Sequence, residues 1–329
     1  MAMKKFINNP DNLVQELLEG FVLANQDKVA LEGSNLVVRV NPKPKDKVAL
    51  VTLGGSGHEP ALSGFVGEGM LDISVPGEIF AAPGPPRVVE ALKAVARDAG
   101  VLFIVLNHAG DVMSANMAVD MAQKEGVTLA KVLTCEDISG DPEDRRGLVG
   151  CLLVIKAAGA AAEAGKSLEE CAAIAQRMAD NMRTLAVAVS GATHPSTGDV
   201  IAEIPDEVMV VGMGQHGEAG GGTQQLKTAD ETAEIMLDAL LNDLNVQSGE
   251  EIAVLLNGVG ATTLMELYLV LRRVKQLLEA KGIGLAHSLV GEYLTVQEMG
   301  GFQMCIARVD DELKALLKAP CNSPALTVK

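Results

Sequence analysis

The sequence predicts an α/β protein of two domains, each with a mixed or parallel sheet flanked by helices. The chain has 329 residues, which is more than one hydrophobic core usually supports. Short apolar runs that end in glycine-rich loops alternate with helical segments, a pattern typical of strands joined by helices. The pattern stops in a stretch rich in Gly, Ser, Thr and Pro and then restarts. We therefore expect a first domain over residues 1–188 and a second over residues 189–329.

The first domain is expected to open with an amphipathic helix over residues 11–24, where apolar residues recur at helical spacing. Residues 48–53 and 101–106 are short apolar runs followed by loops, as in buried strands. The helix between them covers residues 85–98 and starts at two prolines, which the first turn of a helix tolerates. These elements predict a strand, helix, strand unit.

Capping-box spacing and apolar runs also predict the elements after residue 167. Ser167 and Glu170 have capping-box spacing, so a long helix is expected from there to about residue 185. Thr228 and Glu231 have the same spacing at the start of a second-domain helix. The second domain is expected to contain strands at residues 208–211, 252–256 and 303–309 and helices at residues 228–244 and 263–280.

Composition excludes several classes of function. The formal charge of −16 opposes binding to nucleic acid and to anionic membranes. Aromatic residues make up only 2% of the chain, which leaves few platforms on which bases could stack. No apolar run is long enough to span a bilayer, no apolar signal core follows the N-terminus, and five scattered cysteines suggest reduced thiols. We therefore expect a cytoplasmic protein that binds neither nucleic acid nor a membrane.

Glycine-rich loops follow four of the predicted strands, and ligands of open α/β sheets bind beyond the carboxyl ends of strands. These loops cover residues 54–60, 107–111, 212–220 and 257–261. Three of the five histidines, His58, His108 and His216, fall in the first three loops. The loops are therefore the expected positions of a binding site.

Two nucleotide motifs can be compared with these loops. Residues 54–57 could cradle a phosphate, but no GxxxxGK[ST] spacing occurs, so the loop is not a Walker A motif. Residues 212–217 match GxGxxG after a strand, yet more glycines follow where a helix should open, and Asp238 lies inside a predicted helix. An oxidoreductase that binds NAD remains an alternative, and it rests on the glycine loops alone.

Four motifs in order along the chain resemble the dihydroxyacetone kinase substrate domain. They are GGSGHEP around His58, PGEIF at residues 76–80, AGD ending at Asp111, and HGE beginning at His216. The resemblance covers nearly the whole chain and includes residues 319–326. GGSGHEP together with GxHGE is a specific combination.

The resemblance implies roles for the matched residues. His216 is expected to carry a small hydroxyketone as a covalent hemiaminal, and Asp111 and His58 are expected to assist phosphoryl transfer. The loop of Gly55, Ser56 and Gly57 is expected to bind the ketone, Gly55 through its backbone. An imidazole adduct of a ketone cannot lose water to give a neutral imine, so addition would stop at the hemiaminal.

The resemblance also implies partners. This chain is expected to contain no cofactor or metal; ADP and Mg are expected on a separate kinase subunit, which a phosphocarrier of the phosphoenolpyruvate-dependent phosphotransferase system recharges. A homodimer is expected as well. The alternative within the family is a ketone-binding coactivator that does not catalyse transfer. The presence of His58 and Asp111 beside His216 favours catalysis, because a binder needs mainly the covalent anchor.

Each candidate also has a purely structural interpretation. Asp111 would serve as the N-cap of a helix that begins at Val112. His58 would cap its loop through neighbouring backbone groups, and Glu59 and Glu218 would anchor their loops. His194 lies outside the matched motifs and is expected to be structural or solvated.

Overall fold

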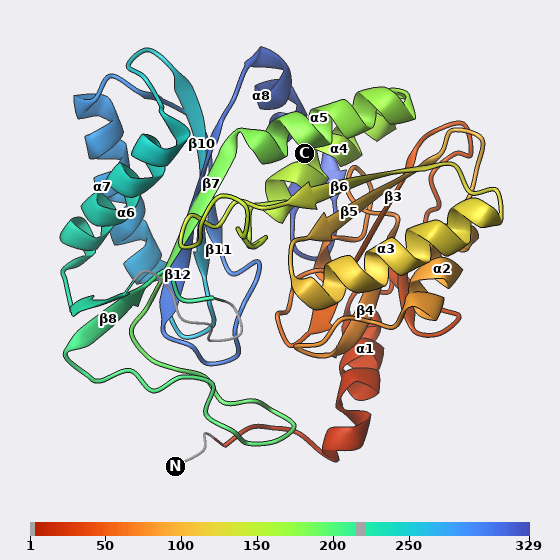
Figure 1. Ribbon diagram of the computed structural model, residues 1–329, viewed down its shortest axis with the longest axis horizontal. Coiled ribbons are helices and arrows are strands. Elements are labelled where there is room, and N and C mark those ends of the chain that lie inside the picture. The colour runs from red at the N-terminus through yellow and green to blue at the C-terminus, as the bar shows by residue number, and fades with distance from the viewer. Residues whose placement is uncertain (1–3, 215–221) are drawn as a thin grey trace. The chain divides into compact units, whose positions relative to one another are not determined.

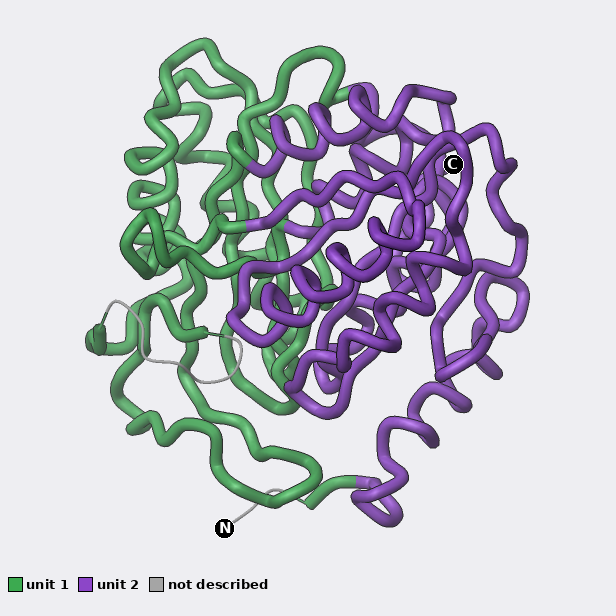
Figure 2. Tube along the Cα trace, turned by 45° about the vertical axis from the view of Figure 1, so that its right-hand side comes forward, with its two compact units in different colours: residues 1–5, 135–150, 180–314 green, residues 6–134, 151–179, 315–329 purple. Residues whose placement is uncertain are grey.

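The computed structural model describes residues 4–214 and 222–329 and divides the chain into two compact units, which Figure 2 distinguishes by colour. Unit 1 comprises residues 1–5, 135–150 and 180–314. Unit 2 comprises residues 6–134, 151–179 and 315–329. Each unit thus combines three stretches of chain. The sequence predicted instead that the chain passes from the first domain to the second only once, after residue 188.

Unit 2 is built on a six-stranded sheet with the order β1-β2-β4-β3-β5-β6 (Figure 1). The strands are β1 (Val29–Glu32), β2 (Leu36–Arg39), β3 (Ala49–Ser56), β4 (Ile73–Ile79), β5 (Val101–Leu106) and β6 (Leu129–Thr134). Strands β4, β3, β5 and β6 run parallel, and β2 is antiparallel to both β1 and β4. The sheet is therefore mixed, and the carboxyl ends of four strands meet at one edge.

Helices pack on this sheet. Helices α2 (Pro85–Ala94) and α3 (Ala109–Lys124) cover one face and share a core with alternate residues of the strands. Helix α4 (Cys151–Glu163) contacts β3 and β5, and its residues 151–162 are all buried. A helix that is apolar on every side belongs in a core, and α4 fits that rule. The prolines of α2 stand in its first turn, as predicted.

Unit 1 is built on a second six-stranded sheet with the order β11-β10-β12-β7-β8-β9. The strands are β7 (Met182–Ala188), β8 (Val208–Val211), β9 (Gly222–Gln225), β10 (Glu251–Gly258), β11 (Gly284–Gly291) and β12 (Gly301–Arg308). Strands β10 and β11 are parallel, and the other described pairs are antiparallel. Both units therefore confirm the α/β class with mixed sheets.

Two helices cover one face of the second sheet, α6 (Ala229–Leu244) and α7 (Leu264–Ala280). Both begin with capping boxes. Thr228 accepts a hydrogen bond from the backbone N–H of Glu231, whose side chain accepts one from the Thr228 backbone. Thr263 and Glu266 do the same for α7. The capping-box prediction for residue 228 is confirmed.

The remaining elements are shorter or lie beside the sheets. They are a 3-10 turn at Pro10–Asn12, α1 (Leu13–Ala24), a 3-10 turn at Ser63–Phe65, α5 (Leu168–Asp180), α8 (Asp311–Lys318), β13 (Cys321–Asn322) and β14 (Thr327–Val328). The opening helix is confirmed, and so is the capping box of α5, in which Glu170 accepts a hydrogen bond from Ser167 N at 2.8 Å.

The helix predicted to reach residue 185 ends at Asp180, and that part of the prediction was wrong. Residues 182–188 form β7, which pairs with β12 in a register that places Leu185 opposite Met304. The run is apolar and short, so its local pattern fits a helix end and a buried strand equally well. Pairing with a strand more than one hundred residues later decides the outcome.

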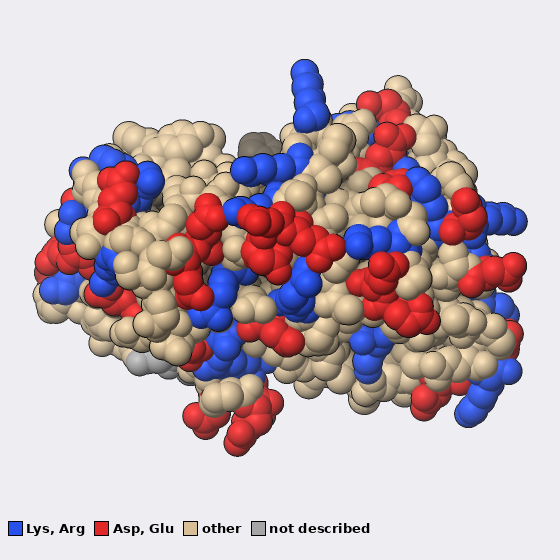
Figure 3. Space-filling view, turned by 90° about the horizontal axis from the view of Figure 1, so that it is seen from above, with Lys and Arg blue, Asp and Glu red and all other residues tan. Residues whose placement is uncertain are grey.

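Charge is distributed over the surface. Figure 3 shows acidic and basic side chains interspersed on the face that it displays. Within the described ranges, no helix is both long and apolar enough to cross a bilayer. All five cysteines are free, and four of them are buried, which agrees with the prediction of reduced thiols.

Gly159 and Gly20 offer a matched pair of helix substitutions. A Cβ added at Gly159 in α4 would lie 2.7 Å from the carbonyl carbon of Gly69 and 2.8 Å from Met70 Cα. We expect Gly159→Ala to lower the free energy of unfolding by about 1–3 kcal/mol through overpacking. Gly20 in α1 has no atom within 4 Å of such a Cβ, so Gly20→Ala should raise it by about 0.5–1 kcal/mol. Urea unfolding followed by circular dichroism measures both, and equal midpoints would contradict the expectation.

Candidate functional site

Four of the predicted binding residues lie at the end of β3 and directly after it. Gly55 and Ser56 are the last residues of the strand, and Gly57 and His58 begin the loop that follows. Gly55 lies against the next loop, because a Cβ at this position would stand 2.7 Å from the backbone nitrogen of Ala81. Ser56 is buried and donates a hydrogen bond from its Oγ to the carbonyl oxygen of Gly77 at 2.8 Å. Gly57 adopts a φ of +99°, a region that residues with a Cβ rarely enter. The loop is thus fixed against the PGEIF segment.

His58 is 5% exposed, and its ring packs on the ring of Phe80 with the centroids 4.8 Å apart and the planes at 41°. Phe80 has a φ of 55°, which is uncommon for an aromatic residue, and its N–H donates to the Ser56 carbonyl at 2.9 Å. Phe80 was not among the predicted site residues. Its signal would have been the PGEIF motif, but a packing partner cannot be read from a motif alone.

Glu59 anchors this loop. One of its carboxylate oxygens accepts a hydrogen bond from the backbone N–H of Gly57 at 3.0 Å. Burial raises the pKa of the Glu59 carboxyl, and the hydrogen bond from Gly57 opposes that rise. The prediction that Glu59 holds its own loop is confirmed.

Asp111 lies in the first turn of α3 and is 9% exposed. The helix begins at Ala109 with His108 as the N-cap residue, so the structural alternative of Asp111 as the cap of a helix starting at Val112 was wrong. The start of α3 is tied to the segment after β4, because Ser114 Oγ donates to the carbonyl oxygen of Pro83 at 2.6 Å. Negative charge is stabilised in the first turn of a helix.

The loops after β3 and β5 and the PGEIF segment at the end of β4 all lie at the carboxyl edge of the unit 2 sheet. Strands β4, β3 and β5 are neighbours and parallel, so their carboxyl ends meet there. The structure therefore places the loop of Gly55, Ser56, Gly57 and His58 at the same edge as Asp111. Their catalytic and binding roles stay predictions.

His216 lies outside the described residues, and so does Glu218. The described chain on either side forms two antiparallel strands, β8 before the segment and β9 after it. A dinucleotide fingerprint requires a helix after its glycines and a parallel strand unit. The strand β9 stands in that place, which argues against the NAD alternative.

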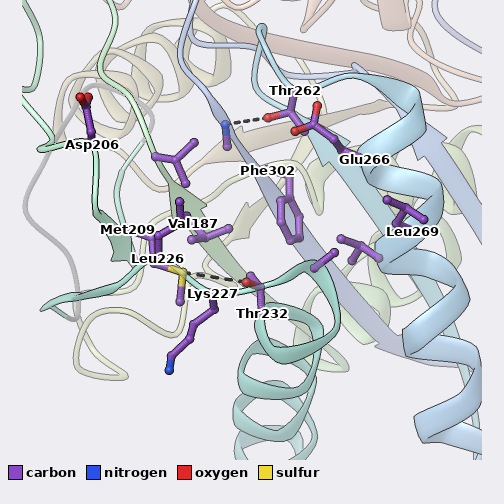
Figure 4. Close-up of a pocket in the computed structure, with 14 residues that line it drawn as sticks. Val187, Asp206, Met209, Leu226, Lys227, Thr232, Thr262, Glu266, Leu269 and Phe302 are labelled. Atoms are coloured by element: carbon purple, nitrogen blue, oxygen red, sulfur yellow. Dashed lines mark hydrogen bonds between the residues drawn. The ribbon is translucent and has the colours of Figure 1, made fainter.

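A pocket of about 390 Å³ lies in unit 1 beside the hairpin of β8 and β9 (Figure 4). Its floor is apolar, and Figure 4 shows the ring of Phe302 among the side chains of Val187 and Met209. Thr262 Oγ1 accepts a hydrogen bond from the backbone N–H of Gly301 at 2.7 Å on one side. None of the predicted site residues lines this pocket. This pocket was not predicted, because its walls come from five separate elements.

The fourth glycine-rich loop has a structural role. Asn257 is fully buried, donates from Nδ2 to the carbonyl oxygen of Leu294 at 2.7 Å, and accepts through Oδ1 from the N–H groups of Tyr293 and Leu294. Its hydrogen-bonding groups are thus committed to the chain. His194 is structural as well, since its Nδ1 accepts from the backbone of Ser196 and Thr197.

Over residues 4–214 and 222–329, no group of three or more His, Cys, Asp and Glu side chains is arranged to hold a metal ion.

Comparisons with known proteins add to this geometry. A family model described as the Dak1 domain matches residues 19–325. The chain is 38% identical over 329 residues to the PTS-dependent dihydroxyacetone kinase 1, dihydroxyacetone-binding subunit DhaK, of Listeria innocua serovar 6a. That match covers 98% of this chain and 100% of the relative.

Two solved structures are similar throughout the chain. The dihydroxyacetone kinase from C. freundii in complex with AMP-PNP and Mg²⁺ superposes with a TM-score of 0.91 at 30% identity, covering 99% of this chain and 61% of the other. The dihydroxyacetone kinase operon co-activator Dha-DhaQ superposes with a TM-score of 0.90 at 28% identity, covering 95% of this chain and 98% of the other.

Proposed function

Because this chain belongs to the Dak1 domain family, we propose that it is the substrate-binding subunit of a kinase for dihydroxyacetone or a similar short hydroxyketone. The observation that carries the proposal is the common edge of the unit 2 sheet, where the loop of Gly55 and His58 lies with Asp111. A ligand at this edge meets a backbone that can approach closely, a buried imidazole and a carboxylate.

The covalent anchor is His216. In this proposal the neutral imidazole nitrogen that bears the lone pair bonds to the ketone carbon, the C=O π bond breaks to give an oxyanion, and the ring becomes an imidazolium. The N–H proton of the other ring nitrogen is then lost to that oxygen, so the product is a neutral hemiaminal. Loss of water to a neutral imine is blocked because the nitrogen bonded to the substrate carries no hydrogen. Glycerol has no carbonyl group, so this contact selects ketones over polyols of the same size.

Asp111 and His58 serve the transfer step. The Asp111 carboxylate accepts the proton of the terminal hydroxyl group as that oxygen attacks the terminal phosphorus atom of the recharged nucleotide. The bond from this phosphorus to the β-phosphate oxygen breaks, and ADP leaves on the partner. His58, oriented by the ring of Phe80, donates a hydrogen bond to the ketone-derived oxygen or to the hydroxyl group. Each role needs a fixed side chain, and both residues are largely buried.

The phosphoryl donor belongs to a partner. We propose that ADP and Mg²⁺ are held by a separate kinase subunit and that a phosphocarrier protein, dependent on phosphoenolpyruvate, recharges it. The Listeria relative is called PTS-dependent and a dihydroxyacetone-binding subunit, which supports a phosphoryl donor on a separate protein. We also propose that the chain forms a homodimer.

Native mass spectrometry after incubation with dihydroxyacetone tests the anchor. We expect a mass increase of one ketone on the wild-type chain and none on His216→Ala. His194→Ala is the matched control, because His194 serves a turn in unit 1, and it should keep the adduct. The proposal would be contradicted by a wild-type chain without an adduct, or by an adduct of equal yield on His216→Ala.

A second function is supported by the similarity to the co-activator Dha-DhaQ over 95% of this chain. A ketone-binding coactivator would form the same adduct and signal through another protein without phosphoryl transfer. The two functions separate when the chain is mixed with an ADP-carrying kinase subunit and a phosphoryl donor. Formation of phosphorylated ketone supports the kinase, and an adduct without turnover supports the coactivator.

A further inference from the structure

Unit 2 contains a cavity of about 270 Å³ at the amino edge of its sheet. Its walls come from the end of β2, the segment that follows it, the start of β4, and the residues around the end of α2. The loops of His58 and Asp111 lie at the carboxyl edge. Strand β4 joins the two edges and spans roughly 20 Å at the usual rise per residue, so the cavity is separate from the proposed reaction site.

The cavity carries an excess of positive charge. Its charged lining residues are Arg39, Lys43, Lys45, Arg97, Glu32 and Asp72. The chain as a whole has a formal charge of −16, so a hollow with an excess of two positive charges stands out from its surroundings. A concentration of Lys and Arg side chains in a concave site attracts anions.

Arg39 is the central side chain of this group and is only 9% exposed. One terminal nitrogen, Nη1, donates to Glu163 at 2.8 Å and approaches Asp72 at 3.5 Å. Its Nε is buried and has no hydrogen-bond partner in the part of the chain that the structure describes. A buried N–H group without an acceptor is costly, and an arginine binds an oxyanion best through two parallel N–H groups. The guanidinium thus keeps an N–H group that no acceptor in the described part of the chain engages.

Two further cations are fixed by the backbone. Lys43 is 3% exposed, and its Nζ lies 3.1 Å from the carbonyl oxygen of Val48 and 3.0 Å from Asp72. Arg97 donates to the carbonyl oxygens of Lys43, Pro44 and Lys47, which holds the segment after β2 in place. These contacts preorganise the cavity, so a ligand would not have to order it.

Lys45 supplies an exposed cation at the rim of the same cavity. From these features we propose that the cavity binds a small oxyanion, namely phosphate or the phosphate group of a small monoester. The planar guanidinium of Arg39 provides paired donors, and the ammonium groups of Lys43 and Lys45 supply point charges, a combination that suits a compact dianion. This ligand is neither the ketone nor the phosphoryl donor, because it occupies the opposite edge of the sheet.

Isothermal titration calorimetry of the full chain tests the site, with inorganic phosphate and β-glycerophosphate as separate probes at constant ionic strength. We expect saturable binding of at least one probe below about 10 mM. Tighter binding of β-glycerophosphate identifies a monoester site, and tighter binding of inorganic phosphate identifies a free-phosphate site. Absence of saturable binding by both would overturn the proposal.

Variants locate the binding. Arg39→Gln should weaken affinity by about tenfold or more, because it removes a charge-assisted hydrogen bond. Lys45→Gln should weaken it by about threefold, since an exposed charge is screened. Lys45 is exposed, so its variant keeps the test valid if Arg39→Gln fails to fold. Lys93→Gln is the control, because Lys93 is an exposed residue of α2 paired with Glu125 outside the lining. Unchanged affinity in both cavity variants would refute the assignment.

Discussion

Replacing Asp111 by asparagine is expected to lower the rate of ketone phosphorylation by about 10²–10⁴-fold. The amide has nearly the shape of the carboxylate but cannot accept the hydroxyl proton during transfer. Covalent capture on His216 does not use that proton, so the mass of the ketone adduct should persist in Asp111→Asn. Turnover is measured with an ADP-carrying partner subunit, and the adduct is measured by native mass spectrometry on the same preparation.

The control is Asp120→Asn, which alters an exposed carboxylate on the same helix, α3. It should leave both turnover and adduct unchanged. An Asp111→Asn variant that turns over as fast as the wild type would contradict the role of general base. Loss of the adduct together with turnover would instead assign Asp111 to ketone binding.

Glu136→Gln is expected to change how stability depends on pH. Glu136 is fully buried; one carboxylate oxygen accepts from Leu148 N at 2.8 Å, and the other has no hydrogen-bond partner among the described residues. Burial raises the pKa of this carboxyl from 4.5 to about 7, against the opposing effect of the Leu148 hydrogen bond.

Proton linkage determines whether the free energy of unfolding rises or falls with pH. Between the unfolded and folded pKa values the folded state holds a proton that the unfolded state has lost, so stability falls as the pH rises through about 7. A shift of this size corresponds to about 3 kcal/mol. The wild type should therefore lose about 3 kcal/mol relative to Glu136→Gln between about pH 4 and pH 8 in urea unfolding.

Glu143→Gln serves as the reference for this measurement, because Glu143 is an exposed carboxyl in the same segment, residues 135–150. It should retain the wild-type dependence on pH. If Glu136→Gln also retained it, the Glu136 carboxyl would not be the group that titrates.

Local signals predicted those elements whose own residues determine them. Strand β5 and helices α6 and α7 agree with the predictions to within a residue at their ends. An apolar run marks β5, and the capping-box spacing of Thr228 and Glu231 marks the start of α6. Strand β7 was missed because its helical and extended patterns are alike, and only its pairing with β12 distinguishes them. Strands that depend on distant partners cannot be identified from their own composition.

The sequence also predicted part of the candidate site. Loops after strands and the family resemblance pointed to His58 and Asp111, and the parallel order of β3 and β5 brings their loops to one edge. Phe80 and the cationic cavity around Arg39 were not found. Both depend on side chains from separate elements, and residues that meet only in three dimensions have no spacing in the sequence.

Unit 2 is assembled from separate stretches of chain, and this affects how the chain folds during synthesis. Residues 315–329 belong to unit 2, where Asn322 pairs with Glu68 and Ala325 N donates to the carbonyl oxygen of Gly64 at 2.9 Å. The ribosome makes the sheet of this unit early, but the C-terminal segment that covers residues 64–69 is made only after residue 314. Until then residues 64–69 lack this cover, and a partly folded unit of this kind is prone to association.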